Sequence, residues 1–183
     1  GALTPASRLL GEVLWGNSGD IGFVMGRLRV GEAMSPPLMR AVNRRLEKIT
    51  DRETSDVLID APPGVSCPAV SAVTGADLVL LVTEPTPFGL FDLRLAHQAF
   101  TPLGMPMAVV INRAGLGDDK VHEYCNRTGL PLLAEIPFDA DAASAYAQGH
   151  ILAEAIPAMR HIFKDLAAAL PALAQKIPEA SHA

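Results

Sequence analysis

Four short apolar runs recur at nearly regular spacing through the middle of the chain, and they end at Asp60, Thr83, Asn112 and Pro137. Successive ends lie 23, 29 and 25 residues apart, which is the length of a repeated strand–helix unit. The runs are almost continuously apolar rather than alternating, as is typical of strands that helices cover on both faces. The sequence therefore predicts an α/β fold with a doubly wound, mostly parallel sheet.

The intervals between these runs have helical patterns. Helices are expected over about residues 36–50, 91–103 and 118–128, and a last one from about Pro157 that Pro171 interrupts. Two extended runs, at 8–15 and 21–28, flank turn-forming residues at 16–20. Asn and Gly tolerate positive φ, so this segment predicts an N-terminal β-hairpin.

Composition narrows the class of protein. With 49% hydrophobic and 19% charged residues, the chain is expected to be globular, as one domain over 1–177 with a disordered tail over 178–183. A net charge of −5 argues against a nucleic-acid surface, and the apolar runs are too short for a membrane span. Two cysteines, Cys67 and Cys125, give no disulfide framework, so a cytoplasmic location is expected.

The segment 57–64, which reads VLIDAPPG, joins an apolar run to a carboxylate and a tight turn. A buried strand over 57–60 would deliver Asp60 to the carboxyl edge of the sheet, where ligands bind in open α/β folds. There the carboxylate could hold Mg²⁺ through its water shell, and Gly64 could bring a backbone N–H to a terminal phosphate. The alternative is a strand end whose turn only stops the strand.

A phosphate-binding loop with the pattern G-x-x-x-x-G-K-[ST] is absent from the printed sequence, because Gly precedes none of its four lysines. The glycine-containing stretch at 16–22 has no lysine and reads as the hairpin turn. The chain begins at Gly1 and has no Met before Met25. We therefore expect a piece of a longer protein whose phosphate loop lies upstream.

Several segments together resemble one family, the MinD/ParA superfamily of deviant P-loop ATPases, and within it the branch that carries an inserted ferredoxin domain. The resemblance extends over roughly residues 1–155. The segments are 57–68 (VLIDAPPGVSCP), 75–86 (GADLVLLVTEPT), 109–113 (VVINR), 136–139 (IPFD) and 26–37 (GRLRVGEAMSPP). In that branch, a segment like 26–37 follows the inserted cysteine cluster.

The resemblance implies roles for individual residues. Asp60 would be the Walker B and switch II carboxylate, and Gly64 would donate its N–H to the γ-phosphate. Asn112 would hydrogen-bond adenine, although a strand-terminating turn residue is the alternative interpretation. The nucleotide-binding set implied in this way is Asn112, Arg113, Pro137 and Pro63, with Asp60 and Gly64 as the catalytic pair. The implied fold is a partial P-loop NTPase domain.

The implied cofactors are ATP and Mg²⁺, with an iron–sulfur cluster in the upstream insert. ATP-driven homodimerisation and a redox or metalloprotein partner are implied as well. Arg27 and Arg29 would face such a partner or, equally, form a solvated edge. Cys67 would lie near a cluster in a dimer or be a small buried residue at a helix start.

Three functions remain open from the sequence. The first is an ATPase that serves iron–sulfur cluster or metalloenzyme assembly, or electron delivery. The second is an ATP-dependent amidase synthetase of the cobyrinic acid a,c-diamide synthase type. The third is a degenerate, non-catalytic binding module.

Overall fold

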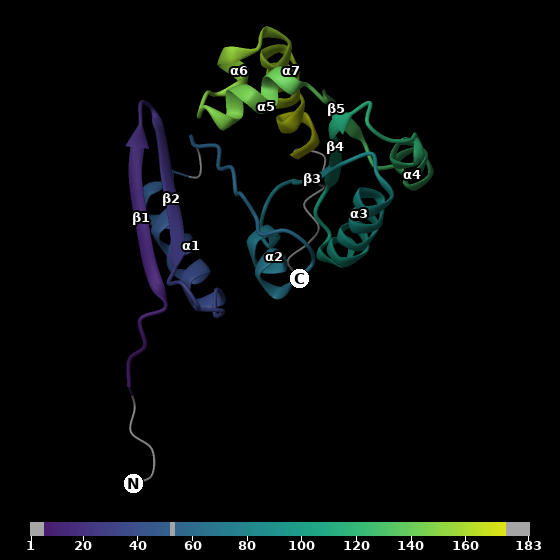
Figure 1. Ribbon diagram of the computed structural model, residues 1–183. Helices are drawn as coiled ribbons and strands as arrows, with labels where there is room; N and C mark the ends of the chain where they lie inside the picture. The colour runs from purple at the N-terminus through teal and green to yellow at the C-terminus, as the bar shows by residue number, and fades with distance from the viewer. Residues whose placement is uncertain (1–5, 52–53, 175–183) are drawn as a thin grey trace. The chain divides into compact units, whose positions relative to one another are not determined.

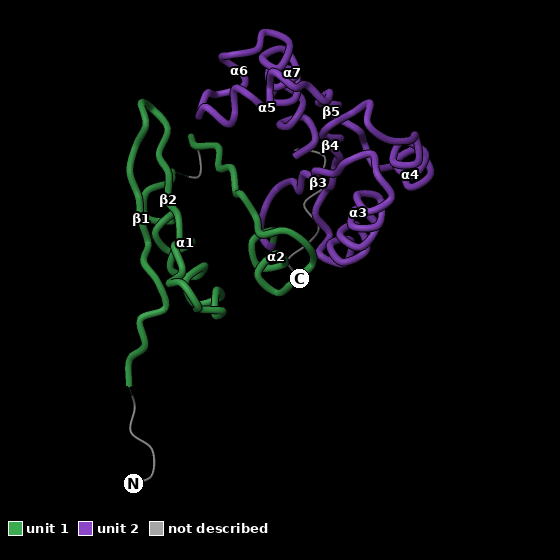
Figure 2. Tube along the Cα trace, in the orientation of Figure 1, with its two compact units in different colours: residues 1–73 green, residues 74–183 purple. Residues whose placement is uncertain are grey.

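The computed structural model describes residues 6–51 and 54–174. The chain divides into two compact units, residues 1–73 and 74–183 (Figure 2). The first unit is a β-hairpin with two helices, and the second is a parallel sheet with helices (Figure 1). The predicted α/β class and the N-terminal hairpin are confirmed. That residues 1–177 act as one domain stays a prediction, and the tail predicted at 178–183 lies outside the described residues.

The first unit begins with β1 (Gly11–Ser18) and β2 (Ile21–Leu28), which pair antiparallel along their whole length. Helix α1 (Pro36–Ile49) packs on one face of this hairpin. The contact is close at Gly26, where an added Cβ would meet the side chains of Leu38 and Val42 at 3.0 and 3.1 Å. The short helix α2 (Cys67–Val73) completes the unit. The helix expected over 36–50 is confirmed to within one residue.

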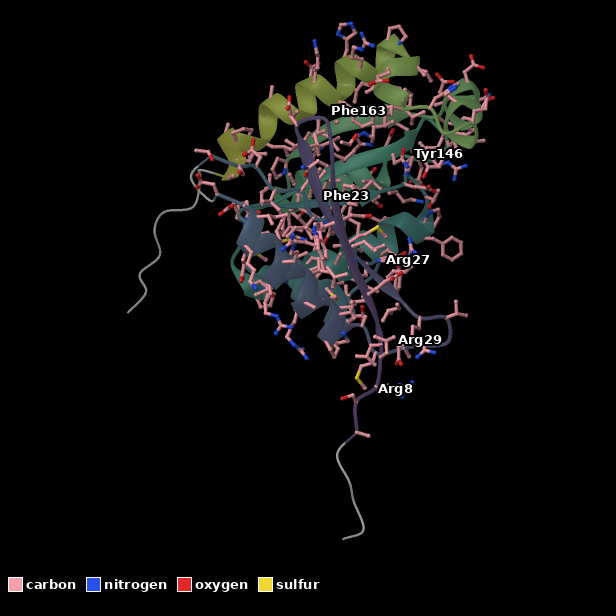
Figure 3. All side chains as sticks on the ribbon, turned by 90° about the vertical axis from the view of Figure 1, so that its left-hand side faces the viewer. Arg8, Phe23, Arg27, Arg29, Tyr146 and Phe163 are labelled. Carbon is pink, nitrogen blue, oxygen red and sulfur yellow. The ribbon has the colours of Figure 1, made fainter. Side chains whose placement is uncertain are left out.

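The arginines of the hairpin already have partners inside the first unit. Arg27 pairs with Glu12 at 3.3 Å, and Arg29 donates a hydrogen bond to the carbonyl oxygen of Leu9 at 3.3 Å. Figure 3 shows both arginines toward the end of the hairpin at which the chain enters, whereas Phe23 lies farther along it. These contacts account for the two charges as parts of a solvated edge, and a docking partner for them stays a prediction.

The strand predicted over 57–60 is wrong. Residues 55–62 have no regular secondary structure, and Leu58 is 93% exposed. A strand needs a neighbouring backbone to complete its hydrogen-bond ladder, and within the described residues no strand pairs with this segment. The apolar run is therefore left extended and uncovered.

The second unit contains the regular strand–helix alternation. Its strands are parallel in the order β3-β4-β5. The elements are β3 (Val79–Thr83), α3 (Pro87–Phe100), the 3₁₀ turn η1 (Thr101–Leu103), β4 (Met107–Ala114), α4 (Lys120–Thr128), β5 (Leu132–Pro137), α5 (Ala140–Ala147), α6 (Leu152–Ala155) and α7 (Pro157–Ala174). The strand ends predicted at Thr83 and Pro137 are confirmed, and β4 continues two residues beyond Asn112.

The core of this unit is centred on β4, the middle strand. Four apolar residues in the middle of this strand are almost fully buried, and the same holds for neighbouring side chains of α4 and α7. These residues are Ala108, Val109, Val110, Ile111, Val121, Cys125 and Met159. The burial of Cys125 confirms its interpretation as a core residue, and burial raises the pKa of its thiol.

Two details of the helices bear on the sequence analysis. Helix α4 ends at Gly129, which has the left-handed conformation (φ 73°) expected of a glycine that closes a helix. By contrast, the interruption predicted at Pro171 is wrong, because α7 continues through it to Ala174. Pro171 cannot donate to the carbonyl oxygen of Ala167, but only three of the described residues of α7 follow it, so little of the helix depends on that bond.

Candidate functional site

The carboxyl ends of β3, β4 and β5 meet at one edge of the sheet, because the three strands are parallel. Glu84 directly follows β3, the segment Asn112–Ala114 ends β4, and Phe138 directly follows β5. In open α/β sheets this edge is the place where ligands bind. All of these residues belong to the second unit.

A β-bulge at the end of β4 shapes this edge. Asn112 pairs with Ile136 of β5, but the next pair along the ladder is Ala114 with Pro137. Arg113 is therefore an extra residue on β4, and its φ of 56° lies in the left-handed region. Bulges of this kind turn a side chain out of the strand pattern and are common beside functional sites.

The side chain of Arg113 joins the ends of the two outer strands. Its guanidinium lies 3.4 Å from Glu84 Oε1, beyond β3, and 5.6 Å from the centre of the Phe138 ring, beyond β5. The backbone N–H of Phe138 also donates to the carbonyl oxygen of Ala114 at 3.0 Å. The structure thus brings Asn112, Arg113 and Pro137 together with two residues to which the sequence analysis gave no role of their own. In the sequence, Glu84 and Phe138 are marked only by their position directly after a strand.

Asn112 keeps its place in the β4 ladder and is half-buried. Its Oδ1 accepts a hydrogen bond from the backbone N–H of Arg113 at 3.0 Å. Oδ1 retains a second lone pair and the Nδ2 amide has two donors, so the group can still bind a ligand that offers both a donor and an acceptor. The residue therefore combines a local structural bond with free hydrogen-bonding capacity.

A polar pocket of about 300 Å³ lies beside this edge, on the α4 side of the sheet. His122 Nε2 approaches Glu135 Oε1 at 3.0 Å in its wall, and Asp118 pairs with Lys120 Nζ at 2.7 Å. The hydrogen bond from Lys120 lowers the pKa of the Asp118 carboxyl. The pocket is lined by Pro85, Ile111, Ala114, Gly115, Gly117, Asp118, Asp119, His122 and Glu135. The predicted site residues are not among them.

Asp60, Pro63 and Gly64 lie on an exposed loop of the first unit. Gly64 has a φ of 79°, and a Cβ there would meet nothing within 4 Å, so its backbone is open to an approaching group. The exposed carboxylate of Asp60 is available to a hydrated cation. That these three residues join Asn112, Arg113 and Pro137 in one site stays a prediction.

The cysteines and the potential metal ligands can be located in the described part of the chain. Cys67 is the first residue of α2, which confirms the expected helix start. Its side chain is exposed, so the expected burial is wrong. Over residues 6–51 and 54–174, no three His, Cys, Asp or Glu side chains are grouped so that they could hold a metal ion.

Comparison with known proteins gives three relatives, all from Methanocaldococcus jannaschii. The uncharacterized protein MJ0579 is 35% identical over 92 residues, which are 50% of this chain and 31% of that protein. The uncharacterized protein MJ0578 is 27% identical over 152 residues, which are 81% of this chain and 51% of that protein. The third, the uncharacterized ATP-binding protein MJ0169, is 36% identical over 98 residues, which are 49% of this chain and 35% of that protein.

The chain thus spans between about a third and a half of the length of these relatives. No protein-family model matches it, and no solved structure matches it. Of the helices in the described residues, none is both long and apolar enough to cross a membrane.

Proposed function

We propose that this chain is part of a MinD-like ATPase that binds Mg-ATP, and that the carboxyl edge of the β3-β4-β5 sheet receives the adenine base. One observation carries the proposal: the bulge at Arg113 gathers Asn112, Arg113 and Pro137 at the edge where parallel sheets bind ligands. The ATP-binding name of the relative MJ0169 supports it.

At the base end of the site, Asn112 would hydrogen-bond the adenine edge. Phe138 is 47% exposed and, with Pro137, offers an apolar surface on which a base can pack. Arg113 lies over the same ring and carries a positive charge toward the ligand. These residues can orient a nucleoside, but they cannot neutralise a triphosphate.

At the phosphate end, Asp60 would hold Mg²⁺ through water, and Gly64 would donate its N–H to the terminal phosphate. Pro63 would hold the turn between them. The printed sequence lacks a Gly-Lys phosphate loop, so the lysine that stabilises the phosphates has to come from residues outside it. Binding of ATP by the 183 residues alone is accordingly expected to be weak.

The iron–sulfur part of the proposal rests on the resemblance of residues 26–37 to the segment that follows a ferredoxin insert. It would make the whole protein a cytoplasmic homodimer that serves cluster or metalloenzyme assembly, or electron delivery. A cobyrinic acid a,c-diamide synthase type of enzyme and a non-catalytic binding module are the competing functions. Upstream sequence with clustered cysteines and a phosphate loop would favour the iron–sulfur ATPase over both.

The test is a titration of the ¹⁵N-labelled chain with Mg-ATP, followed by NMR and by calorimetry. Binding in the millimolar range is expected, with shifts at the amides of Asn112, Arg113 and Phe138. The matched variant Asn112→Ala should lose these shifts, whereas Asn126→Ala on α4 should keep them. An unchanged spectrum at the sheet edge would refute the base site. Micromolar affinity would show that some loop of this chain binds the phosphates instead.

A further inference from the structure

Two arginines on neighbouring helices of the second unit lie against the same tyrosine. The guanidinium carbon of Arg94, on α3, lies 5.4 Å from the centre of the Tyr124 ring, and that of Arg127, on α4, lies 5.6 Å from it. Cation–π attraction holds each charge at the ring, so the two charges are no more than about 11 Å apart. Both arginines are exposed, whereas Tyr124 is buried. The charges therefore lie at the surface over a fixed support.

The hydroxyl of Tyr124 is held in place as well. It lies 2.8 Å from Nδ1 of His97 on α3, and the two rings meet edge to face with their centres 5.8 Å apart. A guanidinium that rests on an aromatic ring still presents its N–H donors to a planar anion. Because the ring restricts both arginine side chains, they lose less conformational entropy when they bind such an anion. The arginine pair, Arg94 and Arg127, is thus preorganised to bind carboxylates.

The arginine pair has no counter-charge among residues 6–51 and 54–174, where neither guanidinium forms an ion pair. Glu123 lies one turn before Arg127 on α4 and does not pair with it. By contrast, Arg8, Arg27 and Arg113 each pair with a glutamate. In a chain with a net charge of −5, the pair is a local excess of positive charge that an added anion would neutralise.

An apolar stripe runs along α3 beside the arginine pair. Its members, Phe88, Phe91 and Leu95, are 84%, 59% and 38% exposed, and their spacing of three and four residues places them on one face of the helix. Arg94 lies on the flank of this stripe that faces α4, and Asp92 lies on the opposite flank. Exposed aromatic residues beside an arginine are typical of the centre of a protein interface.

Charge and composition distinguish among the anionic partners that such a surface could bind. Nucleic-acid surfaces contact about six to ten phosphates, and anionic membranes are recognised by clusters of about four to eight Lys or Arg residues. A stripe on a helix packs instead against the apolar face of another helix. Glutamates one or two turns apart on that helix lie about 5–11 Å apart, which matches the spacing of the arginine pair.

We propose that the α3 stripe and the arginine pair together form a docking surface for an acidic amphipathic helix of a partner protein. The helix lays its apolar face on the α3 stripe and brings carboxylates against Arg94 and Arg127. The surface belongs wholly to the second unit. It does not depend on the proposed nucleotide site, because none of its residues was assigned to that site.

The probe is a synthetic helix-forming peptide with Leu and Phe along one face and Glu beside them, together with a twin that has Gln in place of Glu. Each peptide is titrated into the ¹⁵N-labelled 183-residue chain and followed by NMR. The acidic peptide is expected to bind about tenfold more tightly than its twin, since each exposed charge pair contributes a factor of about two to five. High salt should remove the difference, and the shifts should centre on α3 and α4.

Substitutions assign the effect to individual side chains. Arg94→Gln and Arg127→Gln are each expected to weaken binding of the acidic peptide about threefold and to leave the twin unchanged. Phe91→Ala should weaken both peptides alike, because it removes apolar contact rather than charge. The matched control is Arg44→Gln, which removes the same charge from an exposed position on α1 of the first unit and should change neither affinity.

Four results would overturn the proposal. The first is that neither peptide binds, and the second is that both bind the wild-type chain equally well. The third is that Arg44→Gln weakens the acidic peptide as much as Arg94→Gln does, which would assign the attraction to the charge of the whole chain. The fourth is that a short DNA duplex or an anionic lipid vesicle shifts the α3 and α4 amides at lower concentration than the acidic peptide does, which would assign the surface to that partner.

Discussion

The strain at Arg113 makes a quantitative prediction for the stability of the second unit. An L-residue in the left-handed region costs about 1–2 kcal/mol, and the two contacts of the guanidinium return part of it. The exposed ion pair with Glu84 contributes about 0.2–1 kcal/mol and the stacking on Phe138 about 0.5–1 kcal/mol. Alanine keeps the Cβ, and with it the strain at the bulge, and loses both contacts, so the free energy of unfolding of Arg113→Ala should fall by about 1–2 kcal/mol.

Arg113→Gly loses the same contacts but is relieved of the strain. Glycine also gains freedom in the unfolded chain, which costs about 0.4–1 kcal/mol. The two backbone effects leave Arg113→Gly more stable than Arg113→Ala by about 1 kcal/mol. For a protein of this size the difference in Tm is about 2–4 °C.

Hydrogen exchange at the buried amides of Val109, Val110 and Ile111 measures the opening of the second unit directly. The single tryptophan, Trp15, belongs to the first unit, and its fluorescence serves as the internal control that should not change. If Arg113→Ala proves as stable as Arg113→Gly or more so, the left-handed conformation is not strained as argued, and the reasoning fails.

Three further predictions concern the proposed catalytic role of Asp60, the proposed iron–sulfur cluster and the buried Tyr124. In a full-length protein that supplies the phosphate loop, Asp60→Ala should abolish ATP hydrolysis. The thermal melt should stay unchanged, because the Asp60 side chain is exposed. Retained turnover at saturating Mg²⁺ would refute the role of Asp60. The same protein, purified without oxygen, should show the broad visible absorption of an iron–sulfur cluster, and a colourless, iron-free protein would end that assignment. Burial raises the pKa of Tyr124, so this tyrosine contributes stability that is present below pH 10 and lost as the pH rises through its raised folded-state pKa. Tyrosinate absorbance in a Tyr146→Phe variant, which leaves Tyr124 alone, should show this late ionisation, and titration at or below the ordinary value would contradict it.

The order of elements in the second unit was predictable because its signals are local. Apolar runs without alternation indicate strands covered on both faces, and the spacing between them admits only a helix and its turns. Parallel strands then place Asn112 and Pro137 at the same edge without any knowledge of side-chain contacts. The β-hairpin was predictable for a similar reason, since Gly19 supplies the positive φ (59°) that its turn requires.

The segment 57–60 shows where a prediction from local sequence fails. Its composition matches that of β3, yet β3 is a strand and this segment is not. An apolar segment can adopt an extended conformation by itself. It becomes a β-strand only where another backbone lies alongside to complete the hydrogen-bond ladder. The sequence of the segment carries no information about that neighbour.

By itself, the sequence determined the α/β class, the N-terminal hairpin, the strand–helix order from β3 to β5, and the edge at which Asn112 lies. Only the tertiary structure decided the bulge, the left-handed Arg113 and the direction of the Asn112 carboxamide. A positive φ is signalled in sequence by Gly or Asn, and arginine gives no such signal. It accompanies the bulge where β4 pairs with β5, and the side chain there contacts Glu84, 29 positions away, and Phe138 on a different strand end. Contacts between distant residues, rather than the preference of the residue itself, set the geometry of the site.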